Sequence, residues 1–424
     1  MSSATFKSDG YRFASPAEAV MAVRQELTAL PVEQVGLAVA RGRVLAERIV
    51  ADRDSPALDV SAMDGFAVRM ADLAAMAGAG LAIATGADSE ARIGCAPIQM
   101  PASPMAVRIV TGAPIPSGAE TVIRREDAIV EGGRVRLTTA PANVKPGTSI
   151  RRQGENARGG ATIVPAGTPL TGAVVGALAA FGASMVPVHR RVRVAIISTG
   201  DELVVGTESP MPWQLRDSNG PSLAALLGDR AWIDVVRHEQ VRDEAEAGGG
   251  LALALRHSLE VADAVLLSGG VSMGQRDFVP VVVESLGGRT LFHKLPQRPG
   301  KPMLAALFND GTHAKPILGL PGNPVSVLAT GRRLAIPILA RLAGLPEAAL
   351  ATPMRMIEPD GASLELWWHR LVREELNADG AAVLRLVPPK SSGDIVAAAG
   401  AAGFVEIPPG ARGPGPWPFF AWNY

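Results

Sequence analysis

The middle of the chain, residues 193–342, alternates short apolar runs with segments of helical periodicity. Its apolar runs include VRVAIIS, AVLLS and PILGL, each followed by a Gly-containing loop. Uninterrupted apolar runs of this length suit strands that are buried on both faces of a parallel sheet. Alternation with helices predicts a doubly wound α/β domain with helices on both faces of that sheet. The predicted strands are 192–198, 232–237, 264–268 and 316–320, and the predicted helices are 218–227, 251–259, 278–286 and 324–342.

The N-terminal part begins with an amphipathic pattern over residues 15–30. Ser15, Pro16 and Glu18 stand where an N-cap, a first helical position and a capping partner are expected. A second helix is predicted over 35–46, followed by a loop over 51–59.

From about residue 61 to 140 the pattern changes to short strands separated by Gly and Pro, which predicts a β module. Residues 144–170 read as mostly loop, and 170–181 as a helix of small residues closed by Gly182. Residues 353–424 return to short strands and predict a small C-terminal β domain. The aromatic tail at 416–424 is expected to pack onto that domain, although it also permits contact with a partner protein.

Length and composition narrow the class of protein. A chain of 424 residues exceeds what one core usually organises, so two to four domains are expected. Lys plus Arg and Asp plus Glu are 41 each, which gives no net field to attract nucleic acid or a membrane surface. The single cysteine, Cys95, excludes an intrachain disulfide and fits a reducing compartment. With no signal-peptide pattern and no membrane-spanning window, a cytoplasmic protein is expected.

Three of the predicted strands end in polar, Gly-containing loops: TGDEL, GGVSMGQRD and PGNPVS. In an open parallel sheet, ligands bind beyond the carboxyl ends of the strands, so these loops are expected to converge. Carboxylates bind Mg²⁺, while glycine turns and helix N-termini bind phosphate, so the site suits a phosphate-bearing ligand bridged by a metal ion. The loops offer the carboxylates Asp201, Glu202 and Asp277 and the hydroxyls Ser268, Ser272 and Ser326. Each carboxylate has an alternative as a cap or turn residue, and Asn323 has helix capping as its alternative.

Two cations flank a Pro-Gly turn at residues 295–302. Arg298 and Lys301 on this stiff turn predict an oxyanion clamp, with surface solvation as the alternative. Asp64 in SAMDGFA and Glu155 in SIRRQGEN read on their own as a turn residue and a charged-loop residue. The sequence lacks a dinucleotide GxGxxG fingerprint, a P-loop, HExxH and GxSxG, so nicotinamide-dependent, P-loop and serine-hydrolase chemistries lose their main support.

Eight motifs occur in an order that resembles the molybdopterin molybdotransferases, the MoeA family that includes the E domains of gephyrin and the plant Cnx proteins. The resemblance runs from about residue 15 to 409. The motifs are SAMDGFAV, TGAPIPSGAETVIRRED, SIRRQGEN, STGDEL, RDSNG, SGGVSMGQRDF, RPGKP and GLPGNPVS.

The resemblance implies an α/β multidomain subunit that forms an elongated homodimer. An elongated helical and β linking domain would serve dimerisation, an inserted β domain would interrupt it, and a doubly wound MoaB/MogA-like domain would bind molybdopterin. A β-barrel-like domain would end the chain. These four domains would comprise residues 1–55 with 141–188, 56–140, 189–345 and 346–424.

The resemblance also implies an activity. The family takes adenylylated molybdopterin from a partner molybdopterin adenylyltransferase, releases AMP in a Mg²⁺-dependent step and inserts molybdate. Its product goes to molybdoenzyme apoproteins or their chaperones. Two alternatives stay open: a divergent paralogue that binds or carries the cofactor without efficient insertion, and a gephyrin-like interaction scaffold.

Matching the family's motifs position by position assigns roles to individual residues. Asp64 and Glu155 are expected to reach the site from the neighbouring subunit. The residues implied as catalytic are Asp64, Glu155, Asp201, Asp277 and Lys301, with Asp201 and Asp277 on the metal. The residues implied in cofactor binding are Thr199, Gly200, Asn219, Ser268, Gly269, Gly270, Ser272, Arg298, Pro321, Gly322, Asn323 and Ser392.

The chain departs from the family pattern at four positions. Arg298 stands where lysine is usual, Asn156 replaces an aspartate, and Trp213 replaces a glycine. In the last domain, Glu365 aligns with an arginine that helps to hold molybdate. A carboxylate there would repel the anion, so either Arg370 or Arg373 serves instead or the pocket is altered.

Overall fold

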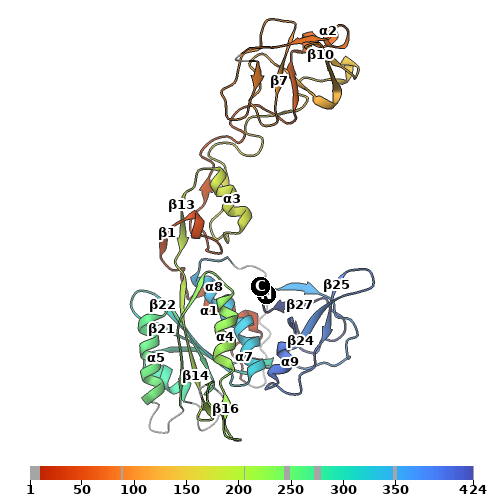
Figure 1. Ribbon diagram of the computed structural model, residues 1–424. Coiled ribbons are helices and arrows are strands. Elements are labelled where there is room, and N and C mark those ends of the chain that lie inside the picture. The colour runs from red at the N-terminus through yellow and green to blue at the C-terminus, as the bar shows by residue number, and fades with distance from the viewer. Residues whose placement is uncertain are drawn as a thin grey trace, which may run out of the picture. The chain divides into compact units, whose positions relative to one another are not determined.

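The computed structural model describes residues 10–86, 89–204, 206–242, 249–271, 278–346 and 351–423. The chain forms two compact units (Figure 1). The first consists of Met1–Glu47, Ala166–Val175 and Met185–Tyr424, and the second of Arg48–Pro165 and Gly176–Ser184. None of the helices in the described part of the chain is long and apolar enough to cross a membrane.

A six-stranded sheet in the order β17-β14-β18-β22-β21-β19 forms the centre of the first unit. The first four strands are parallel, and β21 and β19 continue the sheet in antiparallel orientation. The four predicted strands are confirmed and are parallel to one another, while β21 and β19, which were not predicted from the sequence, pair antiparallel. The connections 295–301 and 310–313 are too short for a crossover, so they force antiparallel pairing. The strands are β14 Val192–Thr199, β17 Ile233–Val241, β18 Ala264–Ser268, β19 Arg289–Lys294, β21 Pro302–Asn309 and β22 Ala314–Leu320.

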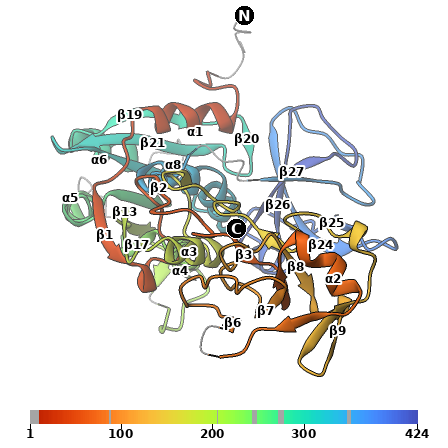
Figure 2. The ribbon, with the colours of Figure 1, turned by 90° about the horizontal axis from the view of Figure 1, so that it is seen from above.

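Helices cover both faces of this sheet, as predicted (Figures 1 and 2). Successive residues of β14 alternate between the faces: Val194 and Ile196 belong to the core with α1, α4 and α8, while Ala195 and Ile197 belong to the core with α5 and α6. The predicted helix 324–342 is interrupted at Gly331–Ala335 by a π-helical turn. The helices are α4 Asn219–Gly228, α5 Gly249–Val261, α6 Val279–Ser285, α7 Pro324–Thr330 and α8 Ile336–Leu342.

The N-terminal segment agrees with only one of the two predicted helices. α1 (Pro16–Gln25) is capped by Ser15, whose Oγ accepts a hydrogen bond of 3.1 Å from Glu18 N. The helix predicted over 35–46 is wrong, because β1 (Val32–Gly36) pairs with β13 (Met185–His189) and only a 3₁₀ turn, Leu37–Val39, follows. Gly42 has a φ of +75°, which a helix interior does not accommodate.

The C-terminal part forms a second sheet in the order β20-β24-β26-β27-β23, with β25 paired to β24. The predicted β domain is confirmed, and the aromatic tail is its strand β27. β20 comes from the turn at 295–302, so Arg298 lies beside Trp368 in parallel register. The elements are β20 Gln297–Arg298, β23 Thr352–Met354, β24 Trp367–Leu376, β25 Ala382–Leu386, α9 Ile395–Ala399, β26 Gly403–Ile407 and β27 Trp417–Ala421.

The second unit contains the predicted β module, a sheet in the order β8-β4-β7-β5-β10-β9 with β6 paired to β7. The small-residue helix is α3 (Gly172–Ala180), followed by Gly182 with a φ of +77°. The module consists of β4 Gly65–Val68, α2 Leu73–Ala77, β5 Leu81–Ile83, β6 Glu90–Ala91, β7 Met105–Ile109, β8 Thr121–Arg124, β9 Ala128–Glu131 and β10 Arg134–Leu137. Short pairs outside the large sheets are β2 Ile49–Val50 with β12 Thr162–Val164, β3 Val60–Ser61 with β11 Ile150–Arg151, and β15 Leu203–Val204 with β16 Leu215–Arg216.

Candidate functional site

The three strand-end loops meet at the carboxyl edge of the sheet, as the sequence predicts. A Cβ atom on Gly269 would lie 2.5 Å from Thr199 O and 2.8 Å from Thr199 Oγ1. On the opposite side, a Cβ on Gly322 would lie 3.7 Å from Gly269 Cα. Gly269 and Gly270 have φ values of +96° and +62°, which only glycine adopts readily. The loops therefore approach one another this closely because side chains are missing there.

Asn219, at the start of α4, connects two of these loops. Its Nδ2 donates hydrogen bonds to Ser268 Oγ at 2.8 Å and to Gly322 O at 2.7 Å. Its Oδ1 and the hydroxyl of Thr199 are buried and have no hydrogen-bond partner among the described residues. Both residues line a cavity of about 600 Å³, together with Glu202, Asp217, Gly269, Gly270, Pro321, Gly322 and Asn323. Unpartnered oxygen atoms at a cavity wall are suited to hold a ligand.

Asp217 is a site residue that we did not single out from the sequence. Its Oδ1 accepts hydrogen bonds from the backbone N–H groups of Asn219 (2.9 Å) and Gly220 (3.0 Å), and its Oδ2 lies 3.4 Å from His238 Nε2. Burial raises the pKa of this carboxyl, but hydrogen bonds from His238, Ser198 and the two amides outweigh it and hold the pKa below its ordinary value. An ionised Asp217 thus fixes the N-terminus of α4 and Asn219 with it. The Asp-Ser-Asn spacing before Pro221 is the signal that could have identified it.

The two residues implied as metal ligands, Asp201 and Asp277, are not found at the cavity among the described residues. Asp201 is exposed in the turn after β14, and Glu202 rather than Asp201 lines the cavity. Ser272 and Asp277 lie outside the described residues. Within the described ranges, no three side chains of His, Cys, Asp or Glu gather closely enough to hold a metal ion. The lining nevertheless includes side-chain oxygen atoms of Glu202, Thr199, Asn219, Asp217 and Ser218, which are the donor type that Mg²⁺ prefers, beside the cation Arg216.

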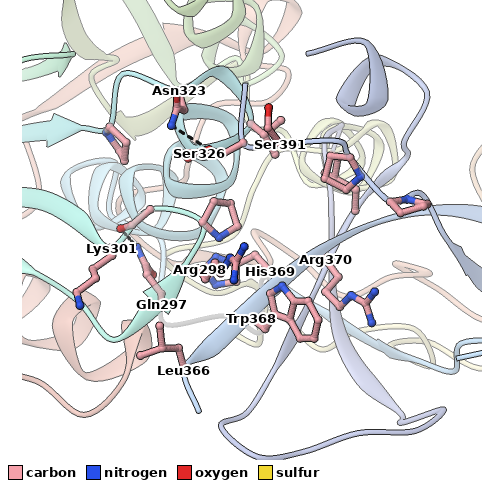
Figure 3. A pocket seen from close by; sticks show the side chains of 18 of the residues that line it. Gln297, Arg298, Lys301, Asn323, Ser326, Leu366, Trp368, His369, Arg370 and Ser391 are labelled. Carbon is pink, nitrogen blue, oxygen red and sulfur yellow. Dashed lines mark hydrogen bonds between the residues drawn. The ribbon is translucent and has the colours of Figure 1, made fainter. Parts of the chain in front are cut away.

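A second cavity, of about 510 Å³, adjoins the first (Figure 3). The two share Pro302, Pro321 and Asn323 in their linings. Four cationic residues and no carboxylate are found among the described residues that line it. The cations are Arg298, Lys301, Arg370 and Lys390. This charge distribution suits an anion, and we refer to this cavity as the anion cavity.

The turn that carries Arg298 and Lys301 is closed by its own hydrogen bonds. Gln297 Nε2 donates to Gly300 O at 2.8 Å, and Leu295 N donates to Lys301 O at 3.0 Å. Gly300 has a φ of +94°, and a Cβ there would lie 2.5 Å from Thr330 Cγ2 of α7. Lys301 Nζ lies 5.4 Å from the centre of the Tyr11 ring. The two cations are therefore held at the cavity on a fixed turn, and their action as an oxyanion clamp stays a prediction.

Asn323 and Ser392 join the α/β domain to the C-terminal domain at this point. Asn323 stands at the N-cap of α7, but its side chain makes no capping bond, so the helix-capping alternative is wrong. Its Nδ2 instead donates to Ser392 Oγ at 2.9 Å, and Val325 N donates to Ser392 O at 3.0 Å. The predicted Ser392 thus lies where the two cavities meet.

Glu365, Arg370 and Arg373 lie in different surroundings in the C-terminal domain. Glu365 is exposed, does not line the anion cavity and lies against Gly410. Arg370 lines the cavity, with its guanidinium 4.1 Å from the centre of the Trp368 ring and Nη1 2.7 Å from Asp360 Oδ1. Arg373 pairs with Glu375 at 2.8 Å and is not part of the lining. Arg370 is therefore the arginine of the last domain that an anion would meet.

Asp64 and Glu155 belong to the second unit. Asp64 Oδ1 accepts hydrogen bonds from Thr111 N and Thr111 Oγ1, both at 2.7 Å, and these bonds lower the pKa of its carboxyl. Glu155 Oε2 accepts from Arg152 N at 3.0 Å. The loops that carry the two acids are joined by pairing of β3 with β11. Their entry into the site from a neighbouring subunit stays a prediction.

Two departures from the family pattern can also be placed. Asn156 Oδ1 accepts a hydrogen bond of 2.7 Å from Arg151 Nη2, a contact that an aspartate would also make. Trp213 is 74% exposed and does not belong to the described lining of either cavity.

The fold and these cavities describe a multidomain α/β protein with one cavity at the strand ends of a doubly wound sheet and a cation-lined cavity beside it. Comparison with known proteins gives the family. Residues 14–182 match the MoeA N-terminal region (domain I and II), and residues 195–341 match a probable molybdopterin binding domain. The Molybdopterin molybdenumtransferase of Nostoc sp. is 38% identical over 74% of this chain and 70% of that protein. The protein of the same name from Staphylococcus epidermidis is 31% identical over 93% of this chain and 92% of its own length.

A solved structure of the molybdopterin biosynthesis MoeA protein of Pyrococcus horikoshii superimposes with a TM-score of 0.73 at 27% identity, covering 96% of this chain and 98% of that one. The chain belongs to the MoeA family, whose named members are transferases of molybdenum cofactor biosynthesis.

Proposed function

We propose that this chain inserts molybdate into adenylylated molybdopterin and releases AMP in a Mg²⁺-dependent reaction. The observation that carries the proposal is the pair of adjoining cavities. One has glycine loops and unpartnered oxygen donors, which suit a phosphate ester and a divalent cation. The other is lined by four cations, which suits an oxyanion. Membership of the MoeA family supports the same assignment.

The proposed roles follow from this division. Glu202, Thr199 and Asn219, together with Asp201 and Asp277, would hold Mg²⁺, which supplies charge neutralisation at the phosphoanhydride. The backbone N–H of Gly270, which has no side chain to cover it, would donate to a phosphate oxygen, whereas Gly269 N donates to Leu320 O at 3.3 Å. Arg298, Lys301, Arg370 and Lys390 attract and orient molybdate.

Asn323 and Ser392 stand at the junction, where the pterin sulfurs must meet the oxyanion. Catalysis in this scheme comes from positioning and electrostatics. Asp64 and Glu155 would complete the site from the neighbouring subunit.

The test is a reconstitution with purified protein, adenylylated molybdopterin, molybdate and Mg²⁺. We expect AMP release and formation of a cofactor that activates an apo-molybdoenzyme. Binding of adenylylated molybdopterin without release of AMP would contradict the proposal and favour a carrier. Glu365, one of the two residues that motivate the carrier alternative, lies outside the lining of the anion cavity. The interaction-scaffold alternative rested in part on an aromatic tail that is free to bind a partner, whereas residues 417–421 form strand β27 of the C-terminal sheet.

The proposal includes a homodimer and the four-domain division given above. Helix α3, GAVVGALAA, is apolar all round, yet Leu178 is its one buried residue. A helix of this composition is ordinarily covered, and a second copy of the chain is the proposed cover. The remaining proposed partners are a molybdopterin adenylyltransferase, which supplies the substrate, and molybdoenzyme apoproteins or their chaperones, which receive the product. The reaction is proposed to take place in the cytoplasm.

A further inference from the structure

A buried polar cluster lies against the anion cavity. His369 of β24 is 4% exposed and belongs to the lining of the cavity (Figure 3). Its Nε2 lies 3.0 Å from Glu406 Oε2 of β26. Arg333, in the π-helical turn, donates from Nε to Glu406 Oε2 at 2.6 Å and from Nη2 to Glu406 Oε1 at 3.0 Å. The three side chains thus form a chain of hydrogen bonds that ends at the cavity.

The hydrogen on the His369 ring can be placed from its partner. Burial raises the pKa of Glu406, but the hydrogen bond from His369 and the charge of Arg333 outweigh it and lower the pKa to about 2. Glu406 is therefore a carboxylate, which only accepts hydrogen bonds. The Nε2 atom of His369 must carry a hydrogen, and the remaining ring nitrogen is Nδ1.

The Nδ1 atom of His369 is buried and has no hydrogen-bond partner among the described residues. A buried polar atom without a partner is costly, and such atoms in native structures call for an explanation. Here the ring also lines a cavity that is rich in cations. A ligand atom that occupies the cavity is the explanation that accounts for both facts.

The charged groups around His369 decide which kind of ligand atom fits. Glu406 faces it from β26, Arg333 lies behind Glu406, Arg298 is in register with the neighbouring Trp368, and Arg370 follows it on β24. The Phe404 ring lies 5.1 Å from the imidazole. Glu406 is the one carboxylate bonded to the ring among these groups, and it lies at Nε2. An oxyanion bound at Nδ1 would require a hydrogen on that nitrogen as well, with the negative charges of Glu406 and of the oxyanion on either side of the ring.

We propose that His369 binds the oxyanion directly, donating a hydrogen bond from Nδ1 to a molybdate oxygen. Glu406 holds the ring in place and Arg333 orients Glu406, so these two are positioning residues. The proposal rests on the proposed function, because molybdate is taken as the occupant of the cavity. It adds one further hydrogen-bond donor, His369 held by the carboxylate of Glu406, to the four cations at the cavity wall.

Two substitutions distinguish the role of Nδ1 from the role of Nε2. In His369→Gln the amide reaches the Nε2 position and retains a donor to Glu406, while the Nδ1 position is lost. In His369→Asn the amide occupies the Nδ1 position, and the contact with Glu406 is lost. Glu375→Gln, on the same strand but outside the lining of the cavity, is the matched control.

The probe is molybdate, titrated calorimetrically into native protein and each variant, with thermal unfolding measured in parallel. We expect His369→Gln to bind molybdate about tenfold more weakly and His369→Asn to stay within about threefold of native, as loss or retention of one charge-assisted hydrogen bond implies. We expect the control to bind as native. Native affinity in His369→Gln, or equal losses in both variants, would overturn the assignment and leave His369 a structural residue. Absence of molybdate binding by the native protein would instead contradict the proposed function and the assignment with it.

Discussion

At the scale of single residues, Asn219 connects the parts of the strand-end site. Its side-chain nitrogen bonds to Ser268 of one loop and to Gly322 of another, while its oxygen remains available to a ligand. One side chain thus fixes the loops and also contributes to the cavity. A residue with both roles should affect stability and binding together.

We predict that Asn219→Ala lowers the free energy of unfolding by about 1–3 kcal/mol, because two hydrogen bonds are lost and their acceptors stay buried. Asn219→Asp should lower the free energy of unfolding further, since a carboxylate oxygen would face the Gly322 carbonyl in place of a hydrogen-bond donor. Thermal unfolding and calorimetric titration with AMP measure the two effects. Native AMP affinity in Asn219→Asp would contradict the role given to this residue.

Strand periodicity placed three Gly-containing loops at the ends of predicted strands, and the structure brings these loops together. Thr199, Asn219, Gly269 and Gly322, which the family resemblance implied as site residues, line the cavity there. His369 was not singled out, since its position at the anion cavity depends on pairing of β20 with β24, about 70 residues apart in the chain. Nothing in the local pattern of WWHR indicates which residue of that strand meets the cavity.

At the scale of elements, the turn at 295–302 and the π-helical turn position the anion cavity. The first joins the C-terminal sheet as β20, and the second directs Arg333 to Glu406. Neither feature follows from hydrophobic periodicity, which predicted one continuous helix over 324–342 and only the four parallel strands of the sheet. Local signals located most of the strands and helices, while the short connections that reverse chain direction decided the topology.

Gly300→Ala tests the turn. The new Cβ would lie 2.5 Å from Thr330 Cγ2 at a backbone φ of +94°, so we expect a loss of about 2–4 kcal/mol of stability and weaker molybdate binding. Gly311→Ala is the matched control, with a φ of +88° and open space around its Cβ. This variant should lose about 1 kcal/mol of stability from backbone strain alone and should bind molybdate with native affinity. Equal molybdate affinities in the two variants would show that the turn does not position the cations.

The Glu406 cluster predicts how stability depends on pH. The pKa of Glu406 is lowered from 4.5 to about 2 in the folded chain. Its contribution, roughly 3 kcal/mol, is therefore complete above about pH 4.5 and is lost as the pH falls toward 2. Glu406→Gln has no such carboxyl, so its melting temperature should fall less steeply between pH 5 and 2 than that of the native protein. Parallel curves would contradict the buried ion pair.

At the scale of the whole molecule, the exposed apolar helix α3 predicts the assembly state. Gly176 lies in this helix with open space around its Cβ within the subunit, so a glutamate fits the monomer but not a covered interface. We expect Gly176→Glu to sediment as a monomer, while the native chain sediments as a dimer. Gly228→Glu, at an exposed glycine of α4 with equally open surroundings, should remain dimeric. A monomeric native chain would contradict the proposed dimer.

The central claim is that the strand-end cavity and the anion cavity act together in one reaction. The most direct measurement is the rate of AMP release from adenylylated molybdopterin by the native protein with Mg²⁺, in the presence and in the absence of molybdate. Because molybdate must occupy the cavity beside Arg298 and Lys301, we predict that its addition accelerates AMP release, and that Lys301→Ala needs a higher molybdate concentration for the same rate. AMP release that is the same with and without molybdate, or that is absent in both, would contradict the account.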